Sequence, residues 1–174
     1  MNILFSNKSD MKFLVDAMLG KLSRFLRIFG YDTIYANDLE ELYGMNPVPD
    51  DRLMQYAKEN SRILITKDYV FYKKMKKDCI YLKGEGVYNY LNQLKEILNL
   101  NYNFIIEKAR CSVCNSALKK VEDKILIKEY VLKETYNNYD DFYQCINPKC
   151  NKVFWNGPHI LDITNKVKNK LSSN

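Results

Sequence analysis

Short apolar runs alternate with amphipathic stretches along the first hundred residues. The apolar runs have the length and composition of strands, and they are MKFLVD at 11–16, DTIYA at 32–36, RILIT at 62–66 and CIYLK at 79–83. The other stretches place apolar residues at helical spacing, over 20–30, 50–61, 69–77 and 88–100. This alternation predicts an α/β domain, with a parallel sheet, right-handed crossovers and helices on both faces.

Two of the predicted helices carry boundary signals. Gly30 is expected to close the first helix, because glycine readily adopts the left-handed conformation that ends many helices. Asp50 or Asp51 is expected to cap the second, since an aspartate side chain can accept hydrogen bonds from the free N–H groups of the first turn. In a sheet of this kind the functional site is expected at the carboxyl ends of the strands.

The alternation stops near residue 103, and the chain beyond it carries the paired cysteines. We therefore expect a domain boundary near residues 100–110, with the α/β domain over 11–102 and a smaller domain over 103–174. Between the cysteine pairs, KILIKEYVLKE is ambiguous between strand and helix, because its β-branched and charged residues favour different structures. The final NKVKNKLSSN is expected to be a fraying basic tail.

The cysteines have the spacing of a metal site. Cys111 and Cys114 enclose two residues, and Cys145 and Cys150 enclose four, so each pair can direct both thiolates at one ion. Four thiolates complete a tetrahedral coordination sphere and leave no position for a catalytic water. The sequence therefore predicts a structural zinc ribbon. The single histidine, His159, is interpreted as a surface residue and not as a ligand.

Composition narrows the possible locations. No run approaches the roughly 18 apolar residues of a membrane span, and the first ten residues lack the features of a signal peptide. These observations predict a cytoplasmic protein with no membrane partner. A reducing compartment favours thiolate metal ligands over disulfides. Cys79, the fifth cysteine, is interpreted as a small buried side chain and not as a reactive thiol.

Aspartates at two predicted strand ends define a second candidate site. Asp16 ends the first strand and Asp68 lies at the end of the third, so both carboxylates should project from one edge of the sheet. Close carboxylates repel one another unless a cation neutralises them, and magnesium or manganese prefers oxygen ligands. Asp38, Asp50 or Asp51 could complete such a site. Helix capping is the alternative explanation for Asp16, Asp50, Asp51 and Asp68, and a solvated loop position is the alternative explanation for Asp38.

Basic residues accompany the predicted acidic edge. The formal net charge of +6 permits an anionic partner, although a solvated surface is the ordinary explanation for it. A phosphodiester substrate would need such a cluster beside the metal ligands. The residues concerned are Lys21, Arg24 and Arg27 on the first helix, Arg62 at the third strand, and Lys73, Lys74, Lys76 and Lys77 after Asp68.

Four segments together carry a resemblance to a known family. They are FLVDAMLGKLSRFLRIFGYDT, DDRLMQYAKENSRILITKD, RCSVCN and FYQCINPKCNKVFWNGPH, in this order. From Met11 to about His159 the chain resembles the PIN-like ribonuclease family named for the C-terminal region of the Mut-seven mutator exonuclease. The resemblance implies a PIN-related domain followed by a zinc ribbon.

The resemblance also implies an activity and a set of residues. It implies a ribonuclease that hydrolyses RNA phosphodiester bonds with magnesium or manganese. By position, Asp16, Asp50 or Asp51, and Asp68 correspond to the family's acids, with Asp16 and Asp68 as metal ligands. Thr66 is the accompanying threonine, and we group it with Lys21, Arg24 and Arg27 as expected substrate-binding residues.

Two other functions are compatible with the sequence. In a non-catalytic RNA-binding or adaptor module, the acids would cap helices, and basic surfaces with tyrosines would hold single strands. The discriminating observation is whether Asp16, Asp68 and Asp50 or Asp51 come within bridging distance of one ion. A phosphoacceptor domain using Asp68 and Lys83 would need a second acid at the end of the first strand, which is absent there. The sequence does not determine the oligomeric state.

Overall fold

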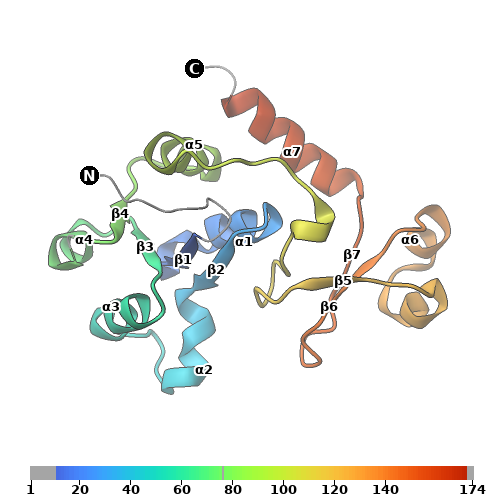
Figure 1. The fold of residues 1–174 in the computed structure, drawn as a ribbon, viewed down its shortest axis with the longest axis horizontal. Helices are drawn as coiled ribbons and strands as arrows, with labels where there is room; N and C mark the ends of the chain where they lie inside the picture. The colour runs from blue at the N-terminus through green and yellow to red at the C-terminus, as the bar shows by residue number, and fades with distance from the viewer. Residues whose placement is uncertain (1–10, 76, 172–174) are drawn as a thin grey trace. The chain divides into compact units, whose positions relative to one another are not determined.

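The computed structural model of this chain describes residues 11–75 and 77–171 (Figure 1). Packing divides these residues into two compact units. The first contains residues 11–26 and Tyr31–Asn101, and the second contains Arg27–Gly30 together with residues 102–171. No pattern in the sequence indicates that a short segment near residue 30 belongs with the C-terminal residues.

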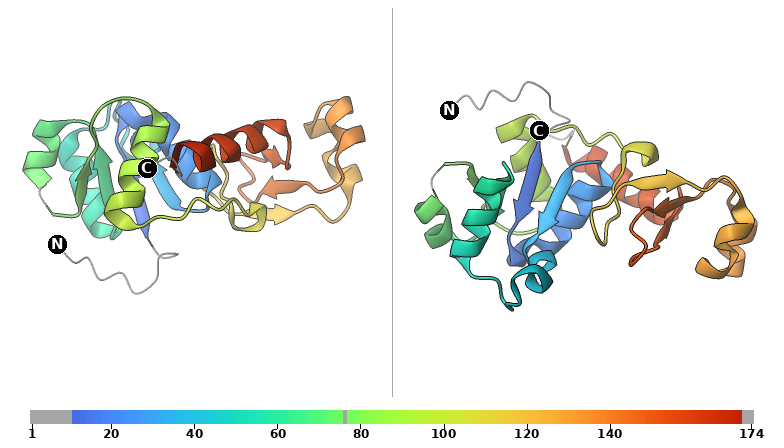
Figure 2. Two further views of the ribbon diagram at one scale, coloured as in Figure 1. Left: turned by 90° about the horizontal axis from the view of Figure 1, so that it is seen from above. Right: turned by 60° about the horizontal axis from the view of Figure 1, so that its bottom comes forward.

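A four-stranded parallel sheet forms the centre of the first unit. Its strands are β1 (Lys12–Val15), β2 (Asp32–Tyr35), β3 (Ile63–Thr66) and β4 (Cys79–Tyr81), in the order β2-β1-β3-β4. β1 pairs with both β2 and β3, and the arrows in Figure 2 show the common direction of the strands. The α/β fold predicted from the alternating pattern is therefore confirmed.

Helices follow the strands at the expected places. They are α1 (Gly20–Ile28), α3 (Asp50–Glu59), α4 (Tyr69–Met75) and α5 (Val87–Leu98). A 3₁₀ turn, Ala17–Leu19, precedes α1. Two short elements between β2 and α3 had no counterpart in the prediction, namely the 3₁₀ turn Ala36–Leu39 and α2 (Glu40–Tyr43), because neither is long enough to show helical periodicity.

Apolar side chains cover both faces of this sheet. On one face, Leu14 of β1 and Leu64 of β3 pack with Leu53 of α3 and Phe71 of α4 in one buried cluster. Successive side chains of a strand point to opposite faces, so the buried residues that alternate with these, Phe13, Val15, Ile63 and Ile65, belong to the other face. Figure 1 shows α1 and α5 on that side and α3 on the opposite one. Burial on both faces explains why the strands read as continuous apolar runs.

The second unit is built around a small antiparallel sheet. Its strands are β5 (Leu118–Lys120), β6 (Tyr143–Cys145) and β7 (Val153–Phe154), in that order. A separate core of Ile127, Phe142 and Val153 packs against it, with the single tryptophan, Trp155, at its border. The remaining elements are the 3₁₀ turns Ile106–Lys108 and Lys124–Tyr130 and the helices α6 (Lys133–Asn138) and α7 (Pro158–Leu171). The ambiguous segment between the cysteine pairs thus forms a 3₁₀ turn and a short helix.

Two boundary predictions were wrong. The residue that caps α3 is Pro49, and neither Asp50 nor Asp51 caps it, since no side-chain cap hydrogen bond is present at this helix. The predicted fraying tail is helical as far as Leu171, because Ile163, Val167 and Leu171 form a buried stripe along α7. Only residues 172–174 of that tail lie outside the described residues.

Gly30 ends α1 as predicted, and the structure gives two reasons for glycine there. Its φ angle is +90°, a conformation that other residues rarely adopt. A Cβ atom at this position would also lie 2.8 Å from the carbonyl oxygen of Lys108. Glycine therefore allows the segment after α1 to lie directly against the backbone of Lys108, within the second unit.

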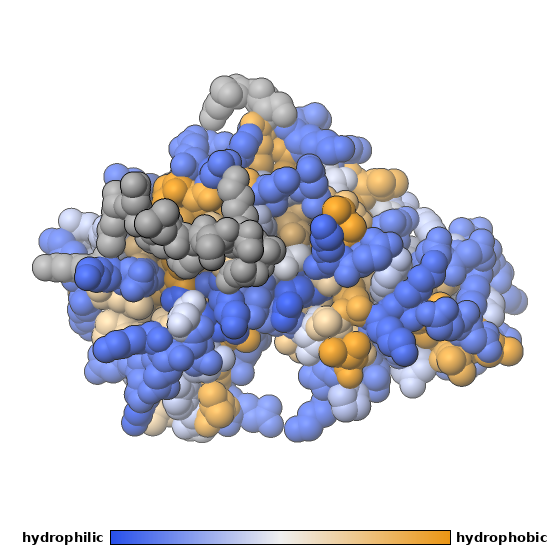
Figure 3. Space-filling view, in the orientation of Figure 1, coloured by the Kyte–Doolittle hydropathy of each residue, from blue (hydrophilic) through white to orange (hydrophobic). Residues whose placement is uncertain are grey.

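Two general properties of the molecule bear on its partners. Among the described residues, no helix is both long enough and apolar enough to cross a membrane. The face drawn in Figure 3 is mostly hydrophilic, with apolar side chains in small separate groups.

Candidate functional site

Asp16 and Thr66 meet at the carboxyl edge of the parallel sheet. The backbone N–H of Asp16 donates to the carbonyl of Ile65 over 3.0 Å, which extends the pairing of β1 with β3 by one residue. The hydroxyl of Thr66 then donates to Oδ2 of Asp16 over 2.5 Å. Both side chains are buried. The carboxylate of Asp16 is therefore held in one orientation by the neighbouring strand.

Asp68 is connected to the same threonine. Its backbone N–H donates to Oγ1 of Thr66 over 2.9 Å, so one hydroxyl links both acids. Its side chain also begins α4, because Oδ1 accepts hydrogen bonds from the N–H groups of Val70 at 2.7 Å and Phe71 at 2.9 Å. The capping explanation thus holds for Asp68, and it accounts for one of its two carboxylate oxygens.

Asp50 and Asp51 differ in their surroundings. Asp50 lies in a half-exposed position 3.4 Å from Nζ of Lys74, and its charge acts on Asp16. Asp51 is exposed, and within the described part of the chain its side chain makes no hydrogen bond or ion pair. Since neither side chain caps α3, Asp50 is the better candidate for a third acid of the site.

The three acids interact electrostatically. Burial is the largest cause of the raised pKa of Asp16, the hydrogen bond from Thr66 opposes it, and the negative charges of Asp50 and Asp68 add to it. A buried carboxylate surrounded by like charges is costly unless a cation is bound. The chemistry of these oxygen donors therefore fits a hard divalent ion.

The spacing of the acids is looser than that of a closed metal site. In the part of the chain that the structure describes, the aspartates form no group of three whose ligand atoms all lie within 4.8 Å of one another. The four cysteines do form such a group. The expectation that Asp16, Asp68 and Asp50 or Asp51 come within bridging distance of one ion therefore stays a prediction, since these acids form no such group among the described residues.

Tyr35 borders the site, and sequence reasoning missed it. Its hydroxyl donates to the carbonyl of Ala17 over 2.8 Å, and its ring lies where a Cβ on Gly20 would approach it to 3.1 Å. Burial raises the pKa of Tyr35, and the charges of Asp38, Glu40 and Asp16 raise it further. No pattern in the sequence marks this residue, because its role depends on how β2 meets the turn after β1.

Asp38 has a local structural role. Its Oδ2 accepts a hydrogen bond from the backbone N–H of Tyr35 over 2.9 Å, which caps the turn at Ala36–Leu39. This contact supports the interpretation of Asp38 as a loop residue more than that of a metal ligand.

The basic residues of α1 divide into two groups. Lys21 and Arg24 are exposed, and the charge of Arg24 acts on Tyr35. Arg27 is only 2% exposed, and its Nη1 donates to the carbonyls of Ser112 at 3.2 Å and Val113 at 2.9 Å. Contrary to the sequence-based prediction, Arg27 is therefore a structural residue of the second unit and is not available to a substrate.

Two further residues also differ from their predicted roles. Thr66 is 0% exposed, so it positions the acids and cannot itself contact a substrate. Arg62 directly precedes β3, at the end of the strand opposite Asp68, where its Nη1 forms an ion pair of 2.8 Å with Asp32. Lys76, another predicted member of the basic cluster, lies outside the described residues.

The four cysteines come together in the second unit as a candidate metal site. The Sγ atoms of Cys111 and Cys150 are 3.7 Å apart, and those of Cys114 and Cys145 are 3.4 Å apart. Zn–S bonds of about 2.3 Å in a tetrahedron place sulfur atoms about 3.8 Å apart. The cluster is therefore close enough to hold a metal ion such as zinc and fits a zinc ribbon.

Local hydrogen bonds preform the first half of this centre. The N–H of Cys111 donates to the carbonyl of Ser116 at 2.8 Å, and the N–H of Asn115 donates to the carbonyl of Cys111 at 2.9 Å. Arg27 holds the two carbonyls between Cys111 and Cys114 from the other side. These bonds fix the turn that aims both thiols at one point.

His159 and Cys79 belong neither to the acidic edge of the sheet nor to the four-cysteine cluster. His159 is exposed in the first turn of α7 and does not belong to the metal-ligand group found among the described residues. Burial, with a smaller contribution from Asp16, raises the pKa of the Cys79 thiol to about 12. A thiol with so high a pKa is a poor nucleophile at neutral pH, which agrees with the interpretation of Cys79 as a packing residue.

Comparison with known protein families gives a match over most of the chain. A family model described as the Mut7-C RNAse domain matches residues 11–167 of the 174-residue chain. The matched range includes the acids of the sheet edge and all four cysteines. No curated protein and no solved structure matches the chain.

Proposed function

Because this chain belongs to the Mut7-C RNAse domain family, we propose that it is a metal-dependent ribonuclease that hydrolyses RNA phosphodiester bonds at the edge formed by Asp16, Asp68 and Asp50. The family's name implies ribonuclease activity in general. The participation of magnesium or manganese, and the assignment of these three acids, are our own proposal.

One observation carries the assignment. A single buried hydroxyl, that of Thr66, donates to Asp16 and accepts from the N–H of Asp68 at the carboxyl ends of the strands. This is the place where ligands bind in open parallel sheets. Asp16 is buried near the negative charges of Asp50 and Asp68. Among the described residues, no basic side chain forms a salt bridge with Asp16. A purely structural role leaves that cost unexplained.

Each residue then has a distinct part in the proposed site. Asp16 and Asp68 would hold the divalent ion, and Asp50 would supply the third carboxylate. A divalent ion held by these acids would lower the pKa of an attacking water and would stabilise charge on the leaving oxygen. Thr66 holds Asp16 in orientation. Lys21 and Arg24, which are exposed on the helix after Asp16, would neutralise phosphates of the RNA.

The zinc ribbon has a structural part in this proposal. Four cysteine ligands leave no open position on the ion, so catalysis is assigned to the acids alone. The thiolate ligands suit the reducing conditions of the cytoplasm, where we propose that the protein acts.

A second candidate function is a non-catalytic RNA-binding or adaptor module. The observation that favours it is the spacing of the acids, which do not gather within 4.8 Å among the described residues. In that case Asp68 serves only as the cap of α4, a role that its contacts to Val70 and Phe71 already satisfy.

Matched aspartate variants separate the two functions. We expect purified, zinc-loaded protein to cleave single-stranded RNA with manganese or magnesium, and Asp68→Asn to lose this activity while keeping α4 intact, because asparagine caps about as well as aspartate. Asp50→Asn should weaken metal activation more than Asp51→Asn, its neighbour in sequence. An adaptor would cleave no RNA, and Asp68→Asn would bind RNA as the unmodified protein does.

A further inference from the structure

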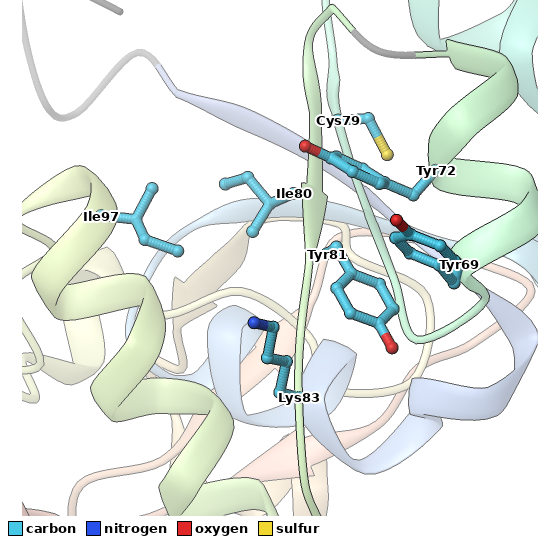
Figure 4. A pocket seen from close by; sticks show the side chains of 7 residues that line it. All are labelled: Tyr69, Tyr72, Cys79, Ile80, Tyr81, Lys83 and Ile97. Carbon is cyan, nitrogen blue, oxygen red and sulfur yellow. The ribbon is translucent and has the colours of Figure 1, made fainter.

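Three tyrosine rings from two separate elements gather beside the end of the sheet. Tyr69 and Tyr72 come from α4 and Tyr81 from β4, and Figure 4 shows their rings together. The ring centroids of Tyr69 and Tyr81 are 5.5 Å apart, those of Tyr72 and Tyr81 are 5.7 Å apart, and those of Tyr69 and Tyr72 are 6.3 Å apart. Such distances are those of aromatic side chains that support one another.

The rings border an open hollow. Its volume is about 380 Å³, and it is lined by residues of α4, β4 and α5 together with Lys83. β4 is the edge strand of the sheet, so no further strand covers this side among the described residues. The hollow is large enough to receive a planar group the size of a nucleobase.

Core packing does not account for this cluster. Phe71, between the two tyrosines of α4, is 1% exposed and belongs to the core, whereas Tyr69 is 52% exposed and Tyr72 and Tyr81 are only partly buried. Among the described residues, the hydroxyls of the three tyrosines make no hydrogen bond, although buried phenols usually find a partner. The half-exposed ring of Tyr69 and its hydroxyl, which has no partner among the described residues, are thus available to a ligand.

Two lysines lie beside the rings and the hollow that they border. Nζ of Lys73 lies 4.6 Å from the centroid of the Tyr69 ring, and Lys83 lines the hollow. The sequence from Lys67 to Lys83 contains six lysines and two aspartates. Aromatic faces combined with excess positive charge are the features that bind single-stranded nucleic acid.

We propose that Tyr69, Tyr72 and Tyr81 form a stacking surface for unpaired bases of RNA, with Lys73 and Lys83 contacting its phosphates. The RNA identity of the ligand rests on the proposed ribonuclease function. Tyr69 directly follows Asp68 in the chain, so a base stacked there belongs to a nucleotide close to the acids. The surface therefore selects single strands as the substrate class, because the bases of a duplex are already stacked and paired.

Binding of two probes of equal charge tests this inference without any cleavage. The probes are a short oligoadenylate and an abasic ribose-phosphate chain of the same length, both labelled and both measured with zinc-loaded protein in the absence of magnesium and manganese. Tyr69→Leu should bind oligoadenylate about 5- to 100-fold more weakly and the abasic chain unchanged. Tyr69→Phe, which keeps the ring, should bind both probes nearly as the unmodified protein does.

Two further variants serve as controls. Tyr130→Leu removes an equally exposed tyrosine from the second unit and should leave both affinities unchanged. Lys83→Gln should weaken binding of both probes and reduce the salt dependence by about one phosphate contact.

The stacking surface is overturned if Tyr69→Leu binds oligoadenylate as tightly as the unmodified protein, or if it weakens both probes equally. It is also overturned if an RNA duplex binds with the same dependence on Tyr69. A protein that shows the Tyr69 effect but cleaves no RNA with manganese keeps the stacking surface and loses the nuclease proposal. A protein that cleaves RNA with manganese but shows no Tyr69 effect keeps the nuclease proposal and loses the stacking surface.

Discussion

The hydroxyl of Thr66 donates to Oδ2 of Asp16 over 2.5 Å, and both side chains are buried at the carboxyl edge of the sheet. The two residues lie on adjacent parallel strands, fifty positions apart in the chain. The same hydroxyl accepts a hydrogen bond from Asp68, so the position of both acids depends on one side chain.

Removing this hydroxyl should therefore disable the site. Thr66→Val keeps the shape of the side chain, and we expect RNA cleavage to fall by about tenfold or more because Asp16 loses its orientation. The free energy of unfolding should fall by about 1–2 kcal/mol, since a buried oxygen and a backbone N–H lose their partner. Thr66→Ser keeps a hydroxyl at this position and should retain most of the RNA cleavage and most of the free energy of unfolding. Full cleavage by the valine variant would show that the contact has no role in activity.

The burial of Asp16 predicts a pH-dependent effect on stability. Burial raises its pKa above the unfolded value of 3.8. Protonation of Asp16 therefore favours the folded state, and this contribution is lost as the pH rises through the folded pKa. With zinc bound and without magnesium or manganese, Asp16→Asn should melt at a higher temperature than the unmodified protein at about pH 8. The difference should narrow as the pH falls through the folded pKa of Asp16 toward the unfolded value of 3.8.

An aspartate outside the site provides the comparison. Asp162→Asn on α7 removes an exposed partner of Lys166 and should shift the melting temperature little at any pH. A lower melting temperature of Asp16→Asn at about pH 8 would mean that the carboxylate stabilises the fold, and the predicted cost of burying it would then be wrong.

The cysteine cluster predicts one zinc per chain. Elemental analysis of purified protein should find about one equivalent, because four thiolates form one closed site. Removal of zinc by a chelator should change the fluorescence of Trp155, which packs beside Phe142 in the core of the second unit. Zinc retained at one equivalent after replacement of both Cys111 and Cys114 by serine would contradict the four-cysteine assignment.

Substitutions of two basic residues of α1 should affect different properties, stability for Arg27 and RNA binding for Lys21. Arg27→Met leaves the carbonyls of Ser112 and Val113 without their donor, so we expect a loss of about 3 kcal/mol in stability. Lys21→Gln, on an exposed position of the same helix, should leave stability nearly unchanged and weaken RNA binding. Thermal unfolding and RNA titration of both variants measure this contrast. Weaker RNA binding by a stably folded Arg27→Met would restore Arg27 as a substrate-binding residue.

The strands were predictable from sequence because both faces of the sheet are buried. A continuous apolar run such as Ile63–Ile65 is typical of a strand that is buried on both faces of a sheet, and turn-forming residues mark where such a run ends. The cysteine spacing predicted the ribbon for a similar reason, since coordination geometry restricts which spacings work. The stripe of Ile163, Val167 and Leu171 was also present in the sequence, and the lysines between these residues obscured it.

Other features depend on contacts between distant segments. Arg27 follows Lys21 and Arg24 at the same spacing, yet its partners lie 85 and 86 positions further along the chain. Helix α3 begins after Pro49, since proline is tolerated at the start of a helix. Asp50 and Asp51 therefore lie inside the helix and do not cap it. The tyrosine cluster joins α4 to β4, and local sequence carries no sign of that meeting.

Manganese-dependent cleavage of single-stranded RNA by the Asp16→Asn protein, with Asp162→Asn as the matched control, tests the proposed function most directly. Both proteins should carry one zinc and unfold at or above the temperature of the unmodified chain. The proposed metal site predicts that Asp16→Asn cleaves at least about a hundredfold more slowly, because several kcal/mol of metal-dependent stabilisation are lost, while Asp162→Asn cleaves normally. Equal cleavage by the two variants, or cleavage that needs no divalent ion, would contradict it.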